Sequence, residues 1–546
     1  MVIEDIVYLL LEVLFGIAGL VMAIVSSRYL HSKNKLVYII APIGSVVFMG
    51  FTGVDVTFLL AYIASALLIL GFFFEKKILR IVLSAFLIIS MIAEFGICNS
   101  SASYRAADYV AEFNDAFEKM EDYYVLTDHK NIDFDDIYEK YLPLFKDANK
   151  RHDKVDCYIA WMKFCDEFKD GHVACAMPGL SKSEVNALYE KLYGYDFGFS
   201  LLRLEDDRVV AVNVDSESDA GKAGIVNGTV VLCWNGKPVE EMISEFDPPL
   251  DRNFPVKEAE DFIRPVFASG NCGGPLTIVY LDENKAEKEV TLSSNGIYKD
   301  RMEDTLSKLL DGTLETNLTV RQVDEKTAFI RIDAMGYDSK SYGSGEYDKM
   351  YEELRDKLQA QKDLGVTDLI IDLRANTGGD PGFDKTVFRL LFPEGEYIMS
   401  YNSVWDYDNN CFMKNADGTF VLGNPNKFYG EGFWGDGDIT VIVSATTISA
   451  GDIFTEVISR LDNVKVIGIT PSNCSGQAVR AVNTKDWMLT FSTVPDLNAD
   501  GTIYIDPDGE RKATIPLDIK VPVDDEFVDA VFNRGEDYLF DLALGM

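Results

Sequence analysis

The 546-residue chain has little histidine and no closely spaced pairs of cysteines. Its eight cysteines contain no C-x-x-C motif and do not cluster with histidines in the way that zinc ligands do. This pattern excludes a typical structural zinc site and leaves disulfide formation open. With so little histidine, chemistry that needs an imidazole base has only four candidates: His31, His129, His152 and His172.

Basic residues are also few, with 51 Lys and Arg against 88 Asp and Glu and a net charge of −37. Residues 1–97 are neutral, so the whole acidic excess belongs to residues 98–546. An acidic surface repels phosphate backbones, and nucleic acid is therefore not expected as a partner. Protein or peptide partners fit this surface better.

Charge is nearly absent from four apolar runs near the N-terminus, at residues 6–27, 36–52, 56–74 and 79–97. A transmembrane helix needs about 20 such residues, so residues 1–98 are predicted to be a membrane segment of about four transmembrane helices. The second run is short and holds Pro42 and Gly44, which leaves its crossing open. Lys and Arg gather in the first and third connections, which predicts a multi-pass cell-membrane protein with its remaining residues on the extracytoplasmic side.

After residue 98 the sequence pattern changes twice along the chain. Residues 102–192 show helical spacing, with Asp133 as the N-cap of one helix, and are predicted to be a helical subdomain. Residues 193–293 consist of short strand patterns between Gly and Asn turns. Residues 294–546 alternate strands and helices, which predicts an α/β core with largely parallel strands. Sites in such sheets lie beyond the carboxyl ends of the strands, where "ANTGG" and "TTIS" fall.

Ser449 stands where the predicted strand "TVIVSA" gives way to the helical pattern "AGDIFTEVISRL". A serine at this place can simply cap the helix. It can also act as a nucleophile, because a tight strand-to-helix turn lifts it from the sheet near the positive end of a helix. A nucleophile of this kind needs a base. His172 is the candidate, since it follows a glycine at a helix end while the other three histidines lie in loop-like contexts.

Four motifs, with the β-rich stretch between the second and the third, resemble those of the tail-specific, or C-terminal-processing, serine peptidases: "IDFDDIYEKYLPLF", "FKDGHVACAM", "DLRANTGGDPG" and "TTISAGDIF". The resemblance covers residues 105–525 and is nearest to the tricorn-core-like branch, which uses histidine. The other branch uses a lysine after the serine, whereas this chain has no lysine between Lys465 and Lys485. The family implies a crotonase-like or ClpP-like core and needs no cofactor or metal.

The family also implies roles for residues at the matching positions. Ser449 would be the nucleophile and His172 the general base. The amides of Ala450 and of Gly378 or Gly379 would form the oxyanion hole.

Two positions depart from the tricorn-type pattern. Gly171 stands where that type has a serine before the histidine, and the glutamate motif is irregular in "DPDGERKATIPLDIKV". Glu510 is the nearest match to the catalytic glutamate, with Asp508 as the alternative. Asp372, Arg374 and Asn376 are expected to hold the glycine turn rather than to catalyse.

Residues 193–293 resemble a PDZ domain in the stretch Phe197-Gly198-Phe199-Ser200 and in "SDAGKAGIVNG". The resemblance implies peptide binding by strand addition. The residues concerned are Gly198, Phe199, Ser200 and Leu201. A β-domain that serves only as a spacer is the alternative.

Together these features predict a membrane-anchored serine endopeptidase that hydrolyses peptide bonds in extracytoplasmic proteins or peptides through an acyl-enzyme. The alternative is a catalytically inactive pseudo-peptidase that binds peptides or acts as a membrane scaffold. The sequence does not give the oligomeric state.

Overall fold

The computed structural model describes residues 108–176, 180–270, 274–313, 315–336, 347–483 and 487–546. The four apolar runs between residues 6 and 97 lie outside these residues.

Helices in the described part of the chain are amphipathic or short, and none is long and apolar enough to cross a membrane. The longest, α6 (Phe134–Arg151), has 18 residues and carries acidic side chains in its first turn and basic ones in its last. A bilayer-spanning helix needs about 20 predominantly apolar residues. This finding corrects the predicted fold class with transmembrane helices and the predicted multi-pass cell-membrane localisation, neither of which the described residues support, and it gives no support to the predicted lipid-bilayer partner.

Tyr109–Met546 form one compact unit, which begins with a helical layer. The Asp133 side chain accepts the N–H of Asp136 and caps α6, as the sequence predicts. Phe113 and Phe145 stack at 4.1 Å between α5 and α6, so aromatic packing holds the layer together. Its helices are α5 (Tyr109–Tyr123), α6, α7 (Lys154–Asp166) and α8 (Lys182–Tyr193).

The stretch between this layer and the α/β core, which we call the insert (residues 193–293), contains two small antiparallel sheets. Phe199, Leu201, Trp234 and Ile278 lie in its buried core. One sheet pairs β2 (Ser200–Arg203) with β3 (Val209–Val212), and the other has the order β5-β4-β6-β7. The remaining elements are α9 (Asp219–Lys222), β4 (Val231–Trp234), β5 (Lys237–Pro238), α10 (Val239–Ser244), α11 (Lys257–Phe267), β6 (Leu276–Leu281) and β7 (Glu287–Leu292).

A six-stranded sheet of order β20-β16-β15-β10-β9-β8 forms the α/β core. All neighbouring pairs are parallel except β8 with β9, so the predicted parallel α/β core is confirmed. Register pairs Asp372 with Ile442, which brings the ends of β10 and β15 to one edge of the sheet. The strands are β8 (Thr319–Gln322), β9 (Thr327–Arg331), β10 (Asp368–Asp372), β15 (Ile439–Ile442), β16 (Val464–Gly468) and β20 (Ile519–Lys520).

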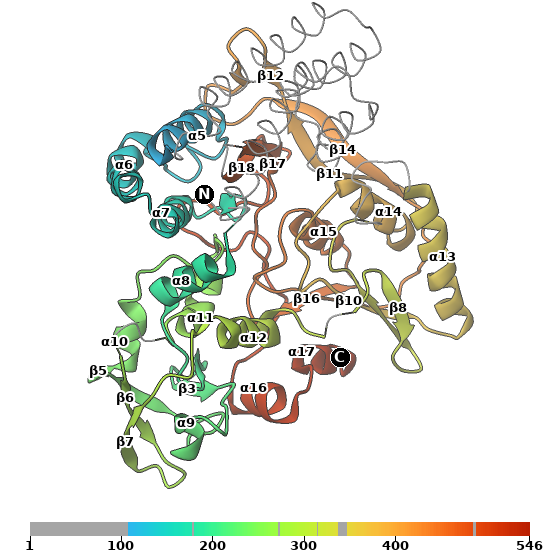
Figure 1. Ribbon diagram of the computed structural model, residues 1–546. Coiled ribbons are helices and arrows are strands. Elements are labelled where there is room, and N and C mark those ends of the chain that lie inside the picture. The colour runs from blue at the N-terminus through green and yellow to red at the C-terminus, as the bar shows by residue number, and fades with distance from the viewer. Residues whose placement is uncertain (1–107, 177–179, 271–273, 314, 337–346, 484–486) are drawn as a thin grey trace, which may run out of the picture. The chain divides into compact units, whose positions relative to one another are not determined.

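Helices pack against this sheet through a continuous apolar core. Helix α14 contacts both α13 and α15, and α17 contacts β15 (Figure 1). The helices are α12 (Lys299–Leu310), α13 (Tyr347–Asp363), α14 (Pro381–Leu391), α15 (Ala450–Ile458), α16 (Asp525–Val528), the π-helix Asp529–Arg534 and α17 (Tyr538–Leu544).

Smaller sheets join the core to the helical layer. Strand β1 (Ala174–Ala176), directly after His172, pairs with β18 (Met488–Val494), which pairs with β17 (Ala478–Asn483). The other strands form the sheet β14-β11-β19 and the pair β12-β13. Their bounds are β11 (Gly395–Ser403), β12 (Trp405–Asp406), β13 (Cys411–Phe412), β14 (Leu422–Gly430) and β19 (Asp496–Leu497).

A buried ion network fixes the end of β10. The Asp372 carboxylate accepts from Arg331 of β9 at 2.6 Å and from Arg374 at 2.7 Å. The Arg374 guanidinium also makes a bidentate pair with Asp537, at 2.7 and 2.8 Å, just before α17. The expectation that Arg374 bridges carboxylates and holds the glycine turn is confirmed.

Replacing Arg374 tests how much the buried ion network contributes to the stability of the fold. Arg374→Leu leaves the Asp372 and Asp537 carboxylates without one partner, and removing one member of a buried ion pair costs about 3–5 kcal/mol. We expect a clear fall in the urea midpoint of the full chain. The control is Lys119→Ala, which removes an exposed pair with Asp115 worth under about 1 kcal/mol. Equal midpoints for the two variants would contradict this role.

Candidate active site

Ser449 lies in a strained turn between β15 and α15. Its φ of 64° and ψ of −123° belong to a region that residues with side chains rarely adopt. Strain of this size, of order 1–3 kcal/mol, persists only when the surroundings enforce it, and it is concentrated at functional sites.

The carboxylate of Asp452, in the first turn of α15, enforces this conformation. It is fully buried and accepts three backbone N–H groups, those of Ser449 at 3.1 Å, Cys474 at 2.9 Å and Ser475 at 2.8 Å. Burial raises the pKa of Asp452 to about 7, and its hydrogen bonds, including those three N–H donors, oppose the rise. Asp452 therefore ties the serine turn to the segment 473–475.

The glycine turn after β10 lies directly against Ser449. A Cβ atom on Gly378, whose φ is +82°, would lie 2.5 Å from the Ser449 Cβ and 3.1 Å from its Oγ. The Gly378 N–H is already donated to the Asn376 side chain, at 2.8 Å. Among the described residues, no acceptor takes the N–H of Gly379 or of Ala450. Of the two glycines, Gly379 is therefore the one whose N–H has no acceptor among the described residues.

His172 lies in the turn that follows α7. Its backbone N–H donates to the Asp170 carboxylate at 2.9 Å, and its carbonyl accepts from Thr490 at 3.0 Å. The imidazole is 8% exposed, and neither ring nitrogen has a hydrogen-bond partner among the described residues. Burial lowers the pKa of His172, while the charge of Asp170 opposes the change. The ring is therefore neutral at pH 7 and able to accept a proton.

Ser475 connects the His172 turn to the serine turn. Its hydroxyl accepts the Gly171 N–H at 3.0 Å, and its carbonyl accepts the Ser449 N–H at 3.1 Å. A Cβ on Gly171 would lie 2.7 Å from the Ile448 side chain, so the two turns are in direct contact. The structure thus places the turn that precedes His172 against the turn of Ser449, which in turn lies against Gly378.

Glu510 and its alternative Asp508 do not join this cluster. Both are exposed, and Glu510 pairs with Lys512 at 2.5 Å. Asp506, on the same stretch, is buried and accepts the Gly476 N–H at 3.1 Å and the Gln477 side chain at 3.0 Å. Burial raises the pKa of Asp506 to about 7. A motif match by spacing missed Asp506, because burial is not visible in the sequence.

Asp170 is a second buried carboxylate to which the sequence assigned no role. Its side chain accepts from the His172 amide, from the Tyr124 hydroxyl at 3.1 Å and from the Ser492 hydroxyl at 2.9 Å. Its place in the "D-G-H" motif was the available signal.

The four residues predicted to bind peptide lie in the insert. Phe199, Ser200 and Leu201 are buried, the Gly198 N–H donates to Asp196, and the Leu201 N–H donates to Ser269. These contacts serve the insert's own packing, and peptide binding by these residues stays a prediction.

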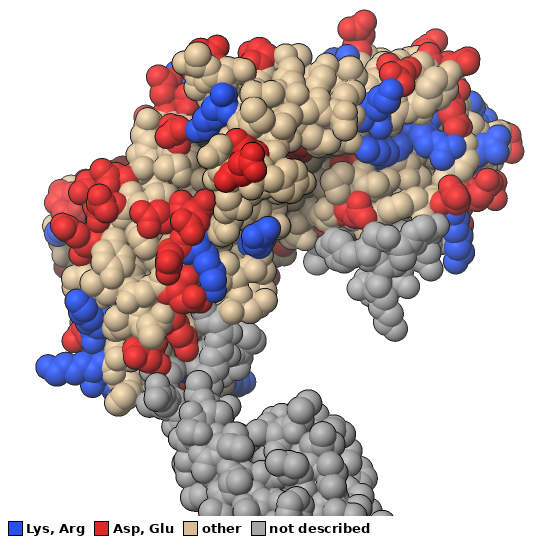
Figure 2. All heavy atoms as spheres, turned by 90° about the horizontal axis from the view of Figure 1, so that it is seen from above, with Lys and Arg blue, Asp and Glu red and all other residues tan. Residues whose placement is uncertain are grey.

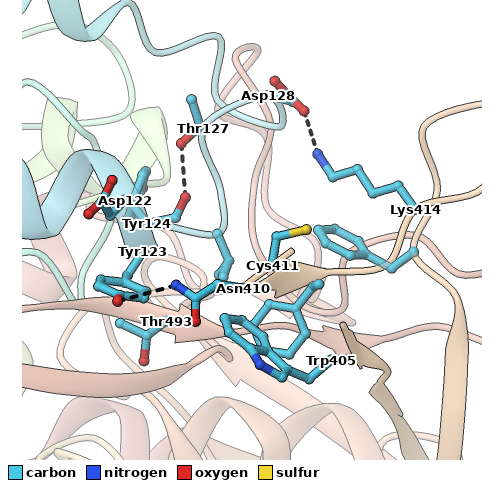
Figure 3. Close-up of a pocket in the computed structure, with 13 residues that line it drawn as sticks. Asp122, Tyr123, Tyr124, Thr127, Asp128, Trp405, Asn410, Cys411, Lys414 and Thr493 are labelled. Atoms are coloured by element: carbon cyan, nitrogen blue, oxygen red, sulfur yellow. Dashed lines mark hydrogen bonds and ion pairs between the residues drawn. The ribbon is translucent and has the colours of Figure 1, made fainter. Parts of the chain in front are cut away.

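A pocket of about 200 Å³ lies between the end of α5 and the β12–β13 pair (Figure 3). Trp405, Phe412 and Phe420 contribute apolar walls, and an ion pair between Lys414 and Asp128 lies on one side. Tyr124 lines the pocket and also bonds Asp170, so the pocket adjoins the His172 turn. Ser449 and His172 themselves do not line it.

Surface charge around the core is predominantly acidic. Figure 2 shows Asp and Glu spread over the face in view, interspersed with Lys and Arg. No group of three His, Cys, Asp or Glu side chains suited to a metal occurs within the described ranges.

Two family models match the chain. Residues 326–513 match peptidase family S41, and residues 105–156 match the tricorn protease C1 domain. The first includes Ser449, Gly378 and Gly379, whereas the insert lies outside both.

Two solved structures of mature CPAF share the fold at low identity. Mature CPAF complexed with lactacystin is 12% identical, with a TM-score of 0.50, over 81% of this chain and 99% of that one. A second structure of mature CPAF is 13% identical, with a TM-score of 0.50, over 78% and 96%. The photosystem II D1 C-terminal processing protease is 15% identical over 78% and 97%, with a TM-score of 0.32.

Asp452→Asn tests the carboxylate beneath the serine turn. An amide offers one acceptor oxygen in place of two and turns an NH₂ group toward backbone donors. We expect a loss of about 2–3 kcal/mol, the range for hydrogen bonds to a charged group, seen as a lower urea midpoint. Asp462→Asn, at an exposed position after the same helix, is the control. Unfolding of Asp452→Asn at the wild-type midpoint would contradict the assignment.

Proposed function

Since the chain is a serine-type peptidase with an S41 core, we propose that Ser449 is its nucleophile and His172 its general base. The observation that supports this best is the double role of Ser475, which bonds the backbone of Ser449 and that of Gly171. Ser475 thereby links the turn that carries the proposed base to the turn that carries the proposed nucleophile.

The reaction follows from these positions. His172 takes the Ser449 proton as the Oγ attacks the carbonyl carbon of a peptide bond. The N–H groups of Ala450 and Gly379 receive the oxyanion, and one such donor typically contributes about 100- to 1,000-fold in rate. The imidazolium returns the proton to the departing amine, which leaves an ester on Ser449. Water, deprotonated by His172, then attacks the ester carbonyl; the bond to Oγ breaks, the imidazolium returns the proton to Ser449, and the acid is released.

Asp170 supports the base in this proposal. Its negative charge favours the protonated form of His172, so it stabilises the imidazolium formed during acylation. Its hydrogen bond to the His172 amide also fixes the turn. Glu510 would have to leave Lys512 and the surface to play such a part, so its catalytic role stays a prediction.

Proteins or peptides are the proposed substrates. Backbone amides recognise the carbonyl that every peptide bond carries, which fits a broad class of substrate. Preference for particular side chains must come from surfaces beyond the two turns.

The alternative is a pseudo-peptidase that binds peptides without cleaving them. One observation favours it: neither nitrogen of the His172 ring has a hydrogen-bond partner among the described residues. Catalytic hydrogen bonds are often long in the absence of substrate, so this geometry does not decide between the two functions.

A fluorophosphonate probe, which reacts with activated serines, distinguishes an active peptidase from a pseudo-peptidase. We expect the full chain to be labelled, and Ser449→Ala and His172→Asn to abolish labelling, because one removes the nucleophile and the other the base. Labelling is read by in-gel fluorescence.

Two matched variants serve as controls. Ser459→Ala removes an exposed serine at the other end of α15, and His152→Asn changes an exposed histidine; both should be labelled like the wild type. An unlabelled but folded wild type would favour the pseudo-peptidase. Labelling that survives Ser449→Ala would mean that another serine is the nucleophile.

The pH dependence of labelling tests the base. Because burial lowers the pKa of His172, its neutral form persists to a lower pH than that of an exposed histidine. We expect the labelling rate constant to stay level as pH falls to the ordinary pKa of histidine and to drop only below it. Labelling reactions quenched at set times between pH 4 and 9, within the pH range in which the protein stays folded, give the rate constant as a function of pH. An acid limb above the ordinary histidine pKa would rule out a buried neutral base.

A further inference from the structure

Asn253 belongs to the insert, in the connection between α10 and α11, yet its side chain reaches the His172 turn. It is 7% exposed. Its Nδ2 lies 2.8 Å from the carbonyl of Cys165, 2.8 Å from that of Val173 and 3.1 Å from that of Asp170. One amide group from the insert therefore gathers three carbonyls of residues 165–173.

The backbone of Asn253 continues this contact into the α/β core. Its carbonyl accepts the Asn473 side-chain amide at 3.1 Å. The Asn473 Oδ1 accepts the Ser475 hydroxyl at 2.8 Å, and that hydroxyl accepts the Gly171 N–H at 3.0 Å. We call Asn253, Asn473 and Ser475 the amide clamp. It encloses the turn from both sides and ends at the residue that also bonds Ser449.

Gly171 shows how tightly the clamp fits. A Cβ there would lie 2.0 Å from the Asn473 Oδ1 and 2.8 Å from the Ser475 Oγ. Because no side chain fits at this position, the turn is held by hydrogen bonds to its backbone. The preceding Lys169 has a φ of 45°, so the turn adopts a backbone conformation that is unfavourable without such support.

The imidazole of His172 needs this support, because no hydrogen bond from the described residues orients the ring. Its direction depends on the backbone on either side. Asn253 bonds the carbonyl of Asp170, two residues before the histidine, and that of Val173, directly after it. The three acceptors exceed the two hydrogens of an amide, so the donor is fully used.

We propose that Asn253 is a positioning residue for His172, through which the insert sets the geometry of the general base. The proposal rests on the proposed function of His172. Displacing a catalytic group by about 1 Å can cost about 100-fold in rate, so a small shift of this turn is enough to slow the reaction strongly. The insert thus completes the catalytic turn in addition to any binding role.

The test measures fluorophosphonate inactivation of the full-length Asn253→Ala and Asn253→Asp variants. Alanine removes the donor, and aspartate keeps the shape but turns a carboxylate toward three carbonyls. We expect kinact to fall about 10- to 100-fold while KI stays within about twofold, because the base moves and the probe's binding surface does not. The final number of labelled sites per folded chain should stay at the wild-type value.

Asn284→Ala, in an exposed turn of the same insert, is the matched control and should keep the wild-type kinact. A purely structural role for Asn253 predicts fewer labelled sites with an unchanged kinact, and that result would overturn the proposal. An unchanged kinact and site number would also overturn it. If alanine prevents folding, the aspartate variant decides by the same two readouts.

Failure of the proposed function is recognised separately. In that case the wild type is not labelled, or its labelling persists in His172→Asn. If the wild type is labelled, His172→Asn abolishes labelling and Asn253→Ala keeps the wild-type kinact, then only the positioning role of Asn253 is disproved.

Discussion

One buried carboxylate supports the whole catalytic geometry. Asp452 accepts the amides of Ser449, Cys474 and Ser475, and without it the last two would be buried donors without partners, each at a cost of about 1–3 kcal/mol. It holds the serine in a backbone conformation that favours glycine, and it fixes the backbone of Ser475, whose hydroxyl accepts the Gly171 N–H. The residues proposed as nucleophile, oxyanion donors and base therefore lie in turns fixed by backbone hydrogen bonds before any substrate arrives.

Patterns along the chain predicted the parts of the fold that local physics controls. Alternating strand and helix periodicity gave the parallel core, and the abrupt change of period at Ser449 marked its turn. What the sequence could not give was the environment brought by distant segments. Glu510 matched a motif by spacing but lies on the surface, whereas Asp506 is buried. Asn253 carries no motif, and only tertiary packing shows its contact with the His172 turn. Hydropathy alone predicted the membrane spans, and no helix in the described part of the chain is long and apolar enough to form one.

His172 illustrates a conflict between stability and function. Burying an imidazole with both nitrogens unpartnered is unfavourable, and native proteins keep such groups mainly where they act. Here the burial also lowers the pKa, so the group is a base under ordinary conditions. The neighbouring charge of Asp170 acts in the opposite direction and becomes useful once the ring is protonated. The same surroundings therefore serve both halves of a proton transfer.

The amide clamp has a consequence for how the enzyme is made. Its members come from two stretches of the chain, residue 253 and residues 473–475, and the second stretch is synthesised well after the turn before His172 that the clamp encloses. Domains fold as the chain emerges, from the N-terminus onward. A ribosome-bound fragment that ends before Ser475 lacks the hydrogen bonds that join base and nucleophile. A protease assembled in this way has no competent site until nearly all of its chain exists, which protects the nascent chain from its own activity.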